Sequence, residues 1–463
     1  MELEEVRILA TCTLGLGFSY AGFQRGLEMA PHAIACDAGS SDFGPYFLGA
    51  NVLQKAPLTI KRDLALLIEG ARRLDIPFMT GSVGGAGGNF HVTGTAGITR
   101  EVAAEKGLKF RMATIHAEVS KAWLVEKVRT GAVRQVGGIG ELTEERIGRM
   151  ERCVAMMGEH PFLRALDQGA QVILAGRSTD PAIFVAPALR AGVPAGVAWH
   201  AAKSIDKGYL ATDRPSDGSP VLARIHDDHF ILEPTRAGSR CTVASVAALT
   251  LHENPNPYRV AQPTGVIDTE QAVYEQIDPE RVKVTGSRYL AAEGPTLKVE
   301  GVELVGYRAV LMTGIRDPRV LERIDEYLQT YRSLLQRAAR SMSLTEDDYT
   351  IQFRVYGRDA ILGKLETAQG VTGHEIGLLV EVVGRTTEIC DAMGSRLGPT
   401  GTRLDINNNL GGGGVFAYPF SPSLVKMGPV YTWSAWHIVD TSEAEMEQIF
   451  AVEIEDVDGS VAA

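Results

Sequence analysis

The sequence predicts an α/β N-terminal domain with a mostly parallel sheet over residues 1–215, followed by an α+β domain over residues 216–463. Three observations predict this fold class. Up to about residue 200, short apolar runs alternate with amphipathic stretches, which is typical of βα units. A polar, turn-rich segment over 203–240 then interrupts the pattern. Beyond it, strand-like alternation is combined with a long helical pattern.

The N-terminal domain contains six apolar runs that are short enough to be strands. They are VRILAT (6–11), HAIAC (32–36), IPFMT (76–80), FRMATIHA (110–117), QVILAG (171–176) and AGVAWH (195–200). Between them, apolar residues recur at helical spacing over 60–74, 95–107 and 119–131. In the second domain, strands are predicted within 283–290, 296–314 and 349–357, and a long helix over 319–342.

Composition and charge narrow the classes of partner. The net charge is -11 and no run of Lys and Arg occurs, so we expect no nucleic-acid partner. A local Arg site for a small anionic substrate stays possible in an acidic protein. The five cysteines lie far apart, which indicates reduced thiols. With no apolar run long enough to cross a bilayer and no basic leader, we expect a cytoplasmic protein without a membrane partner.

The first candidate site segment is CDAGSSDFGP (36–45). Asp37 directly follows a predicted strand, and ligands of open α/β sheets bind at the carboxyl ends of strands. A carboxylate at a buried strand end needs a cation or has a chemical task. Ser40, Ser41 and Asp42 are candidate ligand contacts or caps of the next helix.

A glycine-rich loop, TGSVGGAGGNFH (80–91), follows the strand IPFMT. Its pattern is neither a P-loop nor a dinucleotide fingerprint. Glycines allow backbone N–H groups to approach an anion or acyl group, although such a loop can also be a tight turn. The candidate substrate-binding residues are Gly84, Gly85, Gly87, Gly88 and Asn89, and His91 is a candidate catalytic residue facing the same cleft.

The third segment is TIHAEVSK (114–121). His116 and Glu118 are two residues apart, which places them on one face if the strand continues. Together with Asp37 they are candidate ligands of a divalent metal (Mg, Mn or Zn), or they act as general acid and base. An ordinary His–Glu hydrogen bond below a helix cap is the structural alternative.

The fourth segment, ILAGRSTDPAIF (173–184), runs from an apolar strand into a predicted helix. Asp180 before Pro181 matches a helix N-cap. Arg177 and the helix N-terminus predict a site for a carboxylate or phosphate, with Ser178 and Thr179 as further substrate contacts.

A second glycine-rich segment, DINNNLGGGGVFAYPFSPS (405–423), lies in the second domain. We expect its residues 405–414 to be a lid over the cleft or a surface loop that holds a partner chain. Asn408 and Asn409 are the candidate substrate contacts in it.

Six motifs together resemble the acyclic terpene utilisation (AtuA-like) family. They are CDAGSSDFGPYFLG, GSVGGAGG, IHAE, LAGRSTDPAIFVAPAL, HENPNPYRV and KVTGSRY, and the resemblance runs from about residue 6 to about residue 440. The resemblance implies a role among catabolic genes for branched acids and acyl-CoA esters, in some cases beside a small companion protein.

The expected function is therefore a lyase or hydratase that removes a proton next to a carbonyl of a small carboxylic acid or its CoA thioester. Asp37, His91, His116 and Glu118 supply the acid and base, and Arg177 holds the substrate carboxylate. The alternative is a non-catalytic or partner-dependent large subunit that binds a small companion protein. In either case we expect a homo-oligomer.

Overall fold

The computed structural model describes residues 4–215, 218–251, 254, 256, 258–368, 370–371, 373–404 and 414–459. The chain divides into two compact units, of which the first comprises 1–303 and 433–463 and the second 304–432. The predicted boundary at residue 215 does not coincide with this division. Residues 216–303 belong to the first unit, because β8 (Val221–Ile225) pairs antiparallel with β1 (Val6–Ala10) and extends the same sheet.

The first unit is built on a mixed sheet with the strand order β12-β13-β9-β8-β1-β2-β3-β7-β4-β19 among the described residues. Its centre is parallel and consists of β1, β2 (Ala33–Asp37), β3 (Phe78–Gly81), β7 (Val172–Ala175) and β4 (Lys109–Ile115). The flanking strands are antiparallel: β8, β9 (His229–Pro234), β13 (Val282–Thr285), β12 (Val273–Gln276) and β19 (Val452–Asp458). The α/β prediction is confirmed, whereas the prediction of a mostly parallel sheet holds only for the centre.

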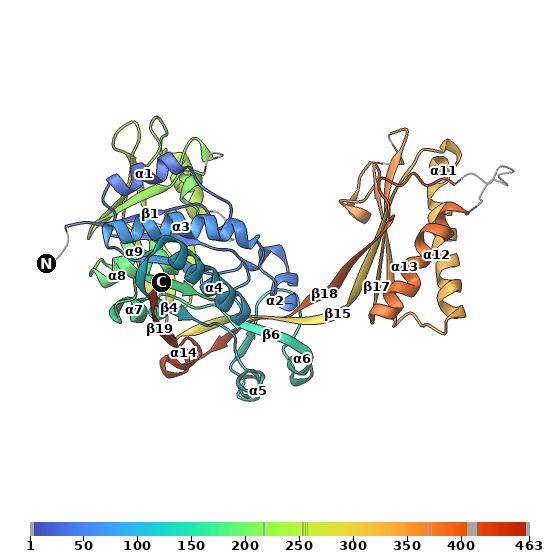
Figure 1. Cartoon of the computed structure of the whole chain (residues 1–463), viewed down its shortest axis with the longest axis horizontal. Helices are drawn as coiled ribbons and strands as arrows, with labels where there is room; N and C mark the ends of the chain where they lie inside the picture. The colour runs from blue at the N-terminus through green and yellow to red at the C-terminus, as the bar shows by residue number, and fades with distance from the viewer. Residues whose placement is uncertain are drawn as a thin grey trace. The chain divides into compact units, whose positions relative to one another are not determined.

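Helices cover both faces of this sheet. Alternate strand residues point to opposite faces, so Ile8 and Leu9 belong to different hydrophobic clusters. On the Leu9 face lie α1 (Tyr20–Glu28), α3 (Pro57–Leu74) and α4 (Asn89–Lys106), and Figure 1 shows α3 and α4 side by side. On the Ile8 face lie α7 (His160–Asp167), α8 (Ala182–Arg190) and α9 (Ala195–Ile205).

Five of the six predicted strands of this region are present, as β1, β2, β3, β4 and β7. The sixth prediction is wrong, because 195–200 forms the first half of α9. Val197 to Ile205 are all buried, so this helix is buried around its circumference and lacks the exposed polar stripe that marks a surface helix. A short apolar run of this kind cannot be distinguished from a buried strand by periodicity.

Shorter elements complete the first unit. They are η1 (Ser41–Phe43), α2 (Tyr46–Ala50), α5 (Lys121–Arg129), β5 (Val133–Gln135), α6 (Glu144–Arg149), β6 (Met150–Ala155), η2 (Gly208–Ala211), α10 (Val243–Leu251), β10 (Arg259–Gln262), β11 (Gly265–Asp268), β14 (Arg288–Ala291) and α14 (Glu443–Ile449).

The second unit is an antiparallel sheet with helices packed on it. Its strands are β16 (Tyr349–Tyr356), β17 (Ile376–Gly384) and parts of β15 (Thr296–Ile315) and β18 (Leu424–Asp440), both of which also have residues in the first unit. Its helices are α11 (Pro318–Glu322), α12 (Ile324–Ser341), α13 (Thr387–Thr402) and the short η4 (Gly363–Leu365).

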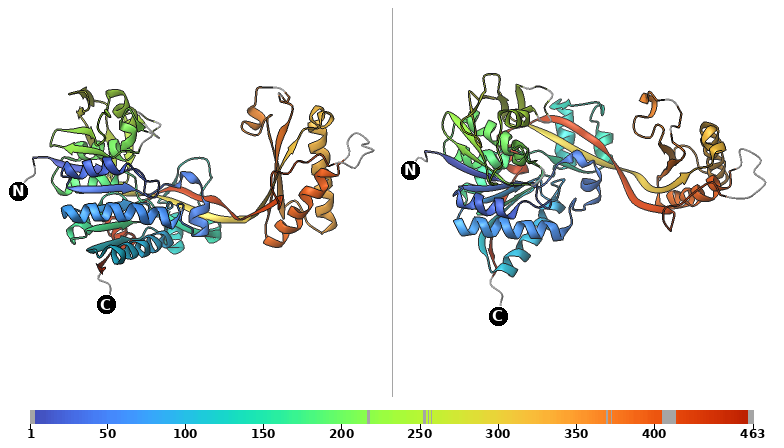
Figure 2. Two further views of the ribbon diagram at one scale, coloured as in Figure 1. Left: turned by 45° about the horizontal axis from the view of Figure 1, so that its top comes forward. Right: turned by 90° about the horizontal axis from the view of Figure 1, so that it is seen from above.

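Buried side chains of α12 such as Tyr331 and Leu335 pack with Leu378 and Val380 of β17. Both views of Figure 2 show α12 and α13 on the same side of this sheet. The long helix predicted over 319–342 is present, divided into α11 and α12. No helix in the described ranges has the length and apolar character needed to cross a bilayer.

Candidate active site

The four candidate segments of the first unit lie side by side at the carboxyl edge of the parallel strands. The Ala38 N–H donates to the carbonyl of Gly81 (3.1 Å), and the Ser82 N–H donates to the carbonyl of Gly176 (2.9 Å). The Gly176 N–H in turn donates to the carbonyl of Ile115 (2.8 Å). The loops after β2, β3, β7 and β4 therefore meet at one edge, where ligands of open α/β sheets bind.

Asp37 is the last residue of β2 and is only 6% exposed. Its Oδ1 accepts a hydrogen bond from the Gly39 N–H (3.3 Å). Burial, and next the negative charge of Asp180, raise the pKa of Asp37 from the ordinary 3.8 to about 7, because Lys207 offsets them only in part. A carboxyl group with this pKa exchanges a proton near neutral pH.

Asp180 is a functional candidate that sequence reasoning assigned to a helix cap. The N-cap of α8 is Pro181, without a side-chain hydrogen bond, so the capping prediction is wrong. The carboxylate of Asp180 instead accepts a hydrogen bond from the Lys207 ammonium (2.9 Å). Burial alone would raise the pKa of Asp180, but the charges of Lys207 and Arg177 outweigh burial and lower it.

Asp37 and Asp180 belong to a larger buried group, which we call the Asp–Lys cluster: Asp37, Asp180, Asp206, Lys203 and Lys207. Lys203 donates to Asp206 (2.7 Å), and both side chains are buried. The cluster holds three carboxyl groups and two ammonium groups. Burial of Asp37 and the negative charge of Asp180 favour a proton on Asp37, and the positive charges of Lys207 and Lys55 oppose it in part.

A pocket of about 250 Å³, which we call the strand-end pocket, opens beside the Asp–Lys cluster. Every lining residue belongs to the first unit. The lining combines charged, polar and apolar side chains, as small-molecule sites do. The residues are Ser40, Asp42, Met156, Arg177, Thr179, Asp180, Pro181, Lys203, Asn254, Val260, Ala261 and Gln262.

Arg177 is 4% exposed, and an internal carboxylate neutralises its charge. Its Nε donates to Glu300 Oε2 (2.9 Å), and Nη2 donates to Ser41 Oγ (3.4 Å). Glu300 also accepts from Ser41 Oγ (3.2 Å) and pairs with Lys298 (2.8 Å). Burial would raise the pKa of Glu300, but Arg177 and Lys298 lower it to about 2. Arg177 thus joins the β2 and β7 loops through Ser41 and Glu300 while it also lines the pocket, and its binding of a substrate carboxylate stays a prediction.

The serines and Asp42 have separate positions. Ser40 Oγ accepts from the Asp42 N–H (3.3 Å) as the N-cap of η1, and donates to Asp42 Oδ2 (2.8 Å). Ser40 and Asp42 line the pocket, whereas Ser41 is buried against Glu300. Ser178 is buried and its N–H donates to Ser82 Oγ (3.3 Å). Thr179 Oγ1 donates to the pocket residue Gln262 (2.9 Å).

The glycine loop is a closely packed connection. A Cβ on Gly87 would lie 2.3 Å from the backbone N of Arg177, and Gly84, Gly85 and Gly87 all have positive φ. The N–H groups of Gly85, Gly87 and Gly88 donate to Ser82 O, Val83 O and His91 Nδ1, respectively. Because these donors are used internally, they do not support the predicted contact with an anion or acyl group, which stays a prediction.

The two histidines and Glu118 do not join the Asp–Lys cluster. Asn89, the first residue of α4, donates its N–H to Glu118 Oε1 (2.7 Å). His91 is fully buried, with its Nε2 2.9 Å from the carbonyl of Val52, and burial lowers its pKa. His116 follows β4, and its Nδ1 is buried without a hydrogen-bond partner.

The metal prediction is corrected by the same geometry. Across the described residues, no group of three or more His, Cys, Asp and Glu side chains is arranged to hold a metal ion, so Asp37, His116 and Glu118 do not form the predicted triad. Asn408, Asn409 and the predicted lid up to residue 413 lie outside the described residues.

Sequence reasoning missed Asp206, Lys203, Lys207 and Glu300. The first three lie in the run AAKSIDKG (201–208), directly after the predicted strand 195–200, and their charges were assigned to the polar, turn-rich segment that begins at residue 203. Reading that segment as a buried helix would have indicated charges that need partners. Glu300 is 123 residues from Arg177, and no local pattern links the two.

Comparison with known proteins gives one family. Residues 83–191 and 212–408 match the family model described as "Acyclic terpene utilisation family protein AtuA". Neither the curated proteins nor the solved structures yielded a match. The matched segments include the glycine loop, the end of β4 and the β7 loop, and they cover most of the chain. The chain therefore belongs to the acyclic terpene utilisation family.

Proposed function

We propose that this protein is a lyase of the hydratase type, which acts on a small branched or hydroxy carboxylic acid or its CoA thioester by removing a proton next to the carbonyl. One observation carries the proposal: Asp180 lines the strand-end pocket and interacts electrostatically with the buried Asp37 behind it, and the environments of the two groups move their pKa values in opposite directions. Such a pair provides an acid and a base at the same pH.

The roles follow from the charge states. Asp180, held ionised by Lys207, is the base that takes the proton from the carbon next to the carbonyl. Asp37, protonated near neutrality, donates its proton to the departing β-hydroxyl group, which leaves as water. The products are the α,β-unsaturated acid or thioester, water, protonated Asp180 and ionised Asp37. Hydration is the reverse.

Substrate contacts are available in the same pocket. Gln262 Oε1 accepts a hydrogen bond from the Thr179 hydroxyl. The Nε2 amide group of Gln262 can therefore donate to a carbonyl or carboxylate oxygen of the substrate. Lys203 lines the pocket and supplies positive charge beside it. In this assignment, the carbonyl oxygen of the substrate faces the donors Gln262 and Lys203, while the carbon next to the carbonyl faces Asp180.

The test is proton exchange in D2O, because exchange requires only the first half of the reaction. Saturated, hydroxy and unsaturated carboxylic acids, free and as CoA esters, are incubated with the purified chain and followed by proton NMR. We expect deuterium at the α-carbon of at least one compound, lost in Asp180→Asn and retained in the exposed control Asp227→Asn. Exchange that is unchanged in Asp180→Asn contradicts the assigned base.

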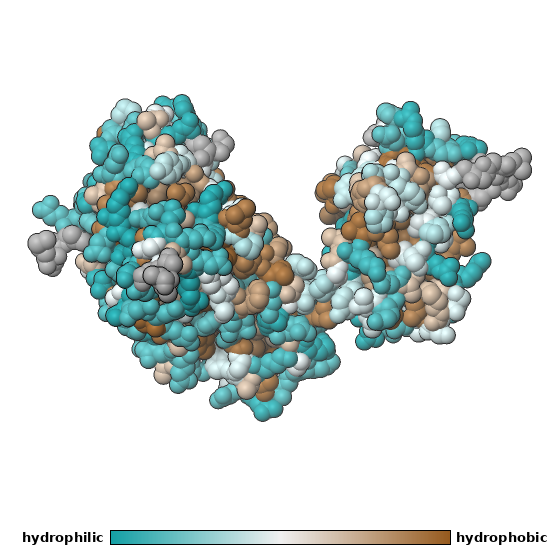
Figure 3. All heavy atoms as spheres, viewed as in Figure 1, coloured by the Kyte–Doolittle hydropathy of each residue, from teal (hydrophilic) through white to brown (hydrophobic). Residues whose placement is uncertain are grey.

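A second candidate function has its own observation. At η4 of the second unit and the turn before it, Leu365 is 79% exposed, Ile361 is 81% exposed, and Leu362 between them is 52% exposed. In Figure 3, hydrophobic side chains lie at the surface of this unit among hydrophilic ones. Such exposure favours a protein contact, which supports a large subunit that binds a small companion protein.

The two candidates give different results in one comparison. Tagged wild-type chain and the double variant Ile361→Ser, Leu365→Ser are used to capture a partner from native lysate. A small protein held by the wild type and lost with the variant, and needed for turnover, favours the companion-dependent function. Full turnover by the isolated chain contradicts it.

A further inference from the structure

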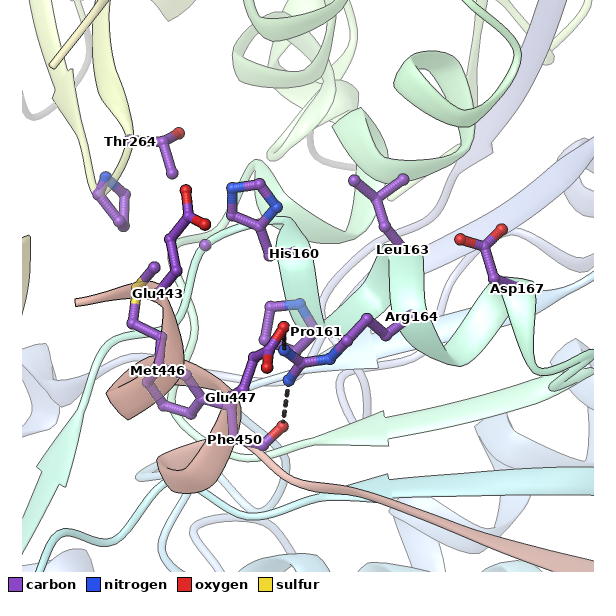
Figure 4. A pocket seen from close by; sticks show the side chains of 12 residues that line it. His160, Pro161, Leu163, Arg164, Asp167, Thr264, Glu443, Met446, Glu447 and Phe450 are labelled. Atoms are coloured by element: carbon purple, nitrogen blue, oxygen red, sulfur yellow. Dashed lines mark hydrogen bonds and ion pairs between the residues drawn. The ribbon is translucent and has the colours of Figure 1, made fainter. Parts of the chain in front are cut away.

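A second pocket lies in the first unit, between α7 and α14 and beside the turn that joins β10 to β11. Its volume is about 300 Å³, and none of its lining residues lines the strand-end pocket. Figure 4 shows its side chains, with α7 on one side and α14 on the other. We call it the α7–α14 pocket.

The inner wall of the α7–α14 pocket is apolar and held in place. Phe450 and Met446 are 1% and 9% exposed, and Leu163 lines the pocket from α7. Arg164 Nη2 donates to the carbonyl of Phe450 (2.8 Å), which ties the end of α14 to α7. A rigid apolar wall of this kind accepts an aromatic ring or a branched chain.

Negatively charged side chains outnumber positively charged ones in the lining of the α7–α14 pocket. Arg164 is the one Lys or Arg side chain in its lining, and it is already paired with Glu447 (3.7 Å). Asp167 is paired with Arg190 (2.8 Å). The exposed carboxylate of Glu443 makes no ion pair with the described residues.

Hydrogen-bonding groups lie near Glu443, at one end of the α7–α14 pocket. Figure 4 shows the Glu443 carboxylate pointing toward the end of the pocket that carries His160 and Thr264. Behind Thr264 lies Glu159, a 5% exposed carboxylate that accepts the Thr264 hydroxyl (3.0 Å). His160 Nε2 lies 3.6 Å from Glu159 Oε1, so the carboxylate left to attract a cation and repel an anion at this end is that of the lining residue Glu443.

We infer that the α7–α14 pocket binds a small primary amine with an apolar body. The body lies on Phe450 and Met446, and the ammonium group faces Glu443. A volume near 300 Å³ suits a ligand of about ten non-hydrogen atoms. The site is independent of the proposed lyase function, because it shares no residue with the strand-end pocket.

The test uses 2-phenylethylamine and 3-phenylpropionate, which have similar bodies and opposite charges. Saturation-transfer NMR and titration calorimetry on the full chain measure binding of each. We expect the amine to bind in the millimolar range and the carboxylate not to bind. Glu443→Gln should weaken amine binding about three- to fivefold, as for an exposed ion pair, and Leu163→Trp should abolish it by filling the pocket.

Glu453→Gln, an exposed carboxylate on β19, is the matched control and should leave binding unchanged. Leu163 is partly buried and packs against the core, so a melting curve of Leu163→Trp checks that the variant is folded. Absence of amine binding, equal binding of both probes, or binding that both variants leave unchanged would overturn the inference. None of these results depends on catalytic turnover.

Discussion

Replacing Asp37 with Asn should stabilise the protein, and the gain should grow with pH. The pKa of Asp37 is raised from the ordinary 3.8 to about 7 in the folded chain. Below pH 4 the Asp37 carboxyl is protonated in both the folded and the unfolded chain, so it does not lower the free energy of unfolding. Between pH 4 and 7 the unfolded chain releases the proton while the folded chain keeps it, so stability falls as the pH rises.

The magnitude follows from the two pKa values. About three pKa units correspond to about 4 kcal/mol, which is the full cost of ionising Asp37 in the folded chain above pH 7. Asn keeps the size of the side chain and the acceptor for the Gly39 N–H but cannot ionise. The free energy of unfolding of the variant should therefore exceed that of the wild type by roughly 4 kcal/mol at pH 8 and by roughly 1–2 kcal/mol at pH 5.

Urea unfolding followed by tryptophan fluorescence measures this difference in the relevant unit. All four tryptophans, at positions 123, 199, 433 and 436, belong to the first unit, so their signal reports its unfolding. Asp227→Asn, at an exposed position, is the control and should show no gain that depends on pH. A gain for Asp37→Asn that is equal at pH 5 and pH 8, or a loss at pH 8, would refute the reasoning.

Three further predictions concern the supports of the site. Glu300→Gln should destabilise the first unit by about 3–5 kcal/mol in urea unfolding, because it leaves the buried Arg177 without its carboxylate; a loss below about 1 kcal/mol, as expected for the exposed Glu293→Gln, would contradict this. Gly87→Ala should lower the melting temperature strongly, because its Cβ would meet the backbone of Arg177 and its φ is +65. Gly97→Ala, in α4 with open space around it, should instead raise stability by up to about 1 kcal/mol, and similar effects at the two positions would be inconsistent with this packing. Lys207→Met should raise the pKa of Asp180 by removing its main counter-charge, so the acidic limb of the pH–rate profile of the D2O exchange should move to higher pH; an unmoved limb would exclude Asp180 as the base.

The parallel core of the fold was predictable because its strands are short, mostly apolar and separated by amphipathic helices. Helix α9 was not, since its buried surface removes the polar stripe that periodicity detects. The division into two units was also not predictable from the sequence. Strands β8 and β9 lie within the polar segment 203–240 that resembles a linker, yet β8 pairs with β1 and β9 pairs with β8, and the long-range pairing with β1 leaves no local signal.

The position of the site was predictable for a topological reason, because parallel strands bring the loops at their carboxyl ends together. The hydrogen-bond and ion-pair partners within the site were not predictable. The bond from Arg177 to Glu300 and the pairing of Asp180 with Lys207 join distant segments, and the pairing of Asp180 changes the role that the local sequence indicated. The glycines of the 80–91 loop were correctly placed at the strand ends, but neighbouring backbone fills the space that a ligand was expected to use.

The most direct test of the acid–base pair is the ionisation of Asp37 itself. The chain is labelled with ¹³C at aspartate carboxyl groups, the Asp37 signal is assigned with Asp37→Asn, and its chemical shift is followed from pH 4 to pH 9. The structure predicts a midpoint near pH 7, which moves further upward in Lys207→Met because the cation that favours ionisation is lost. A midpoint near pH 4 that is insensitive to Lys207 would contradict the assignment of Asp37 as the acid.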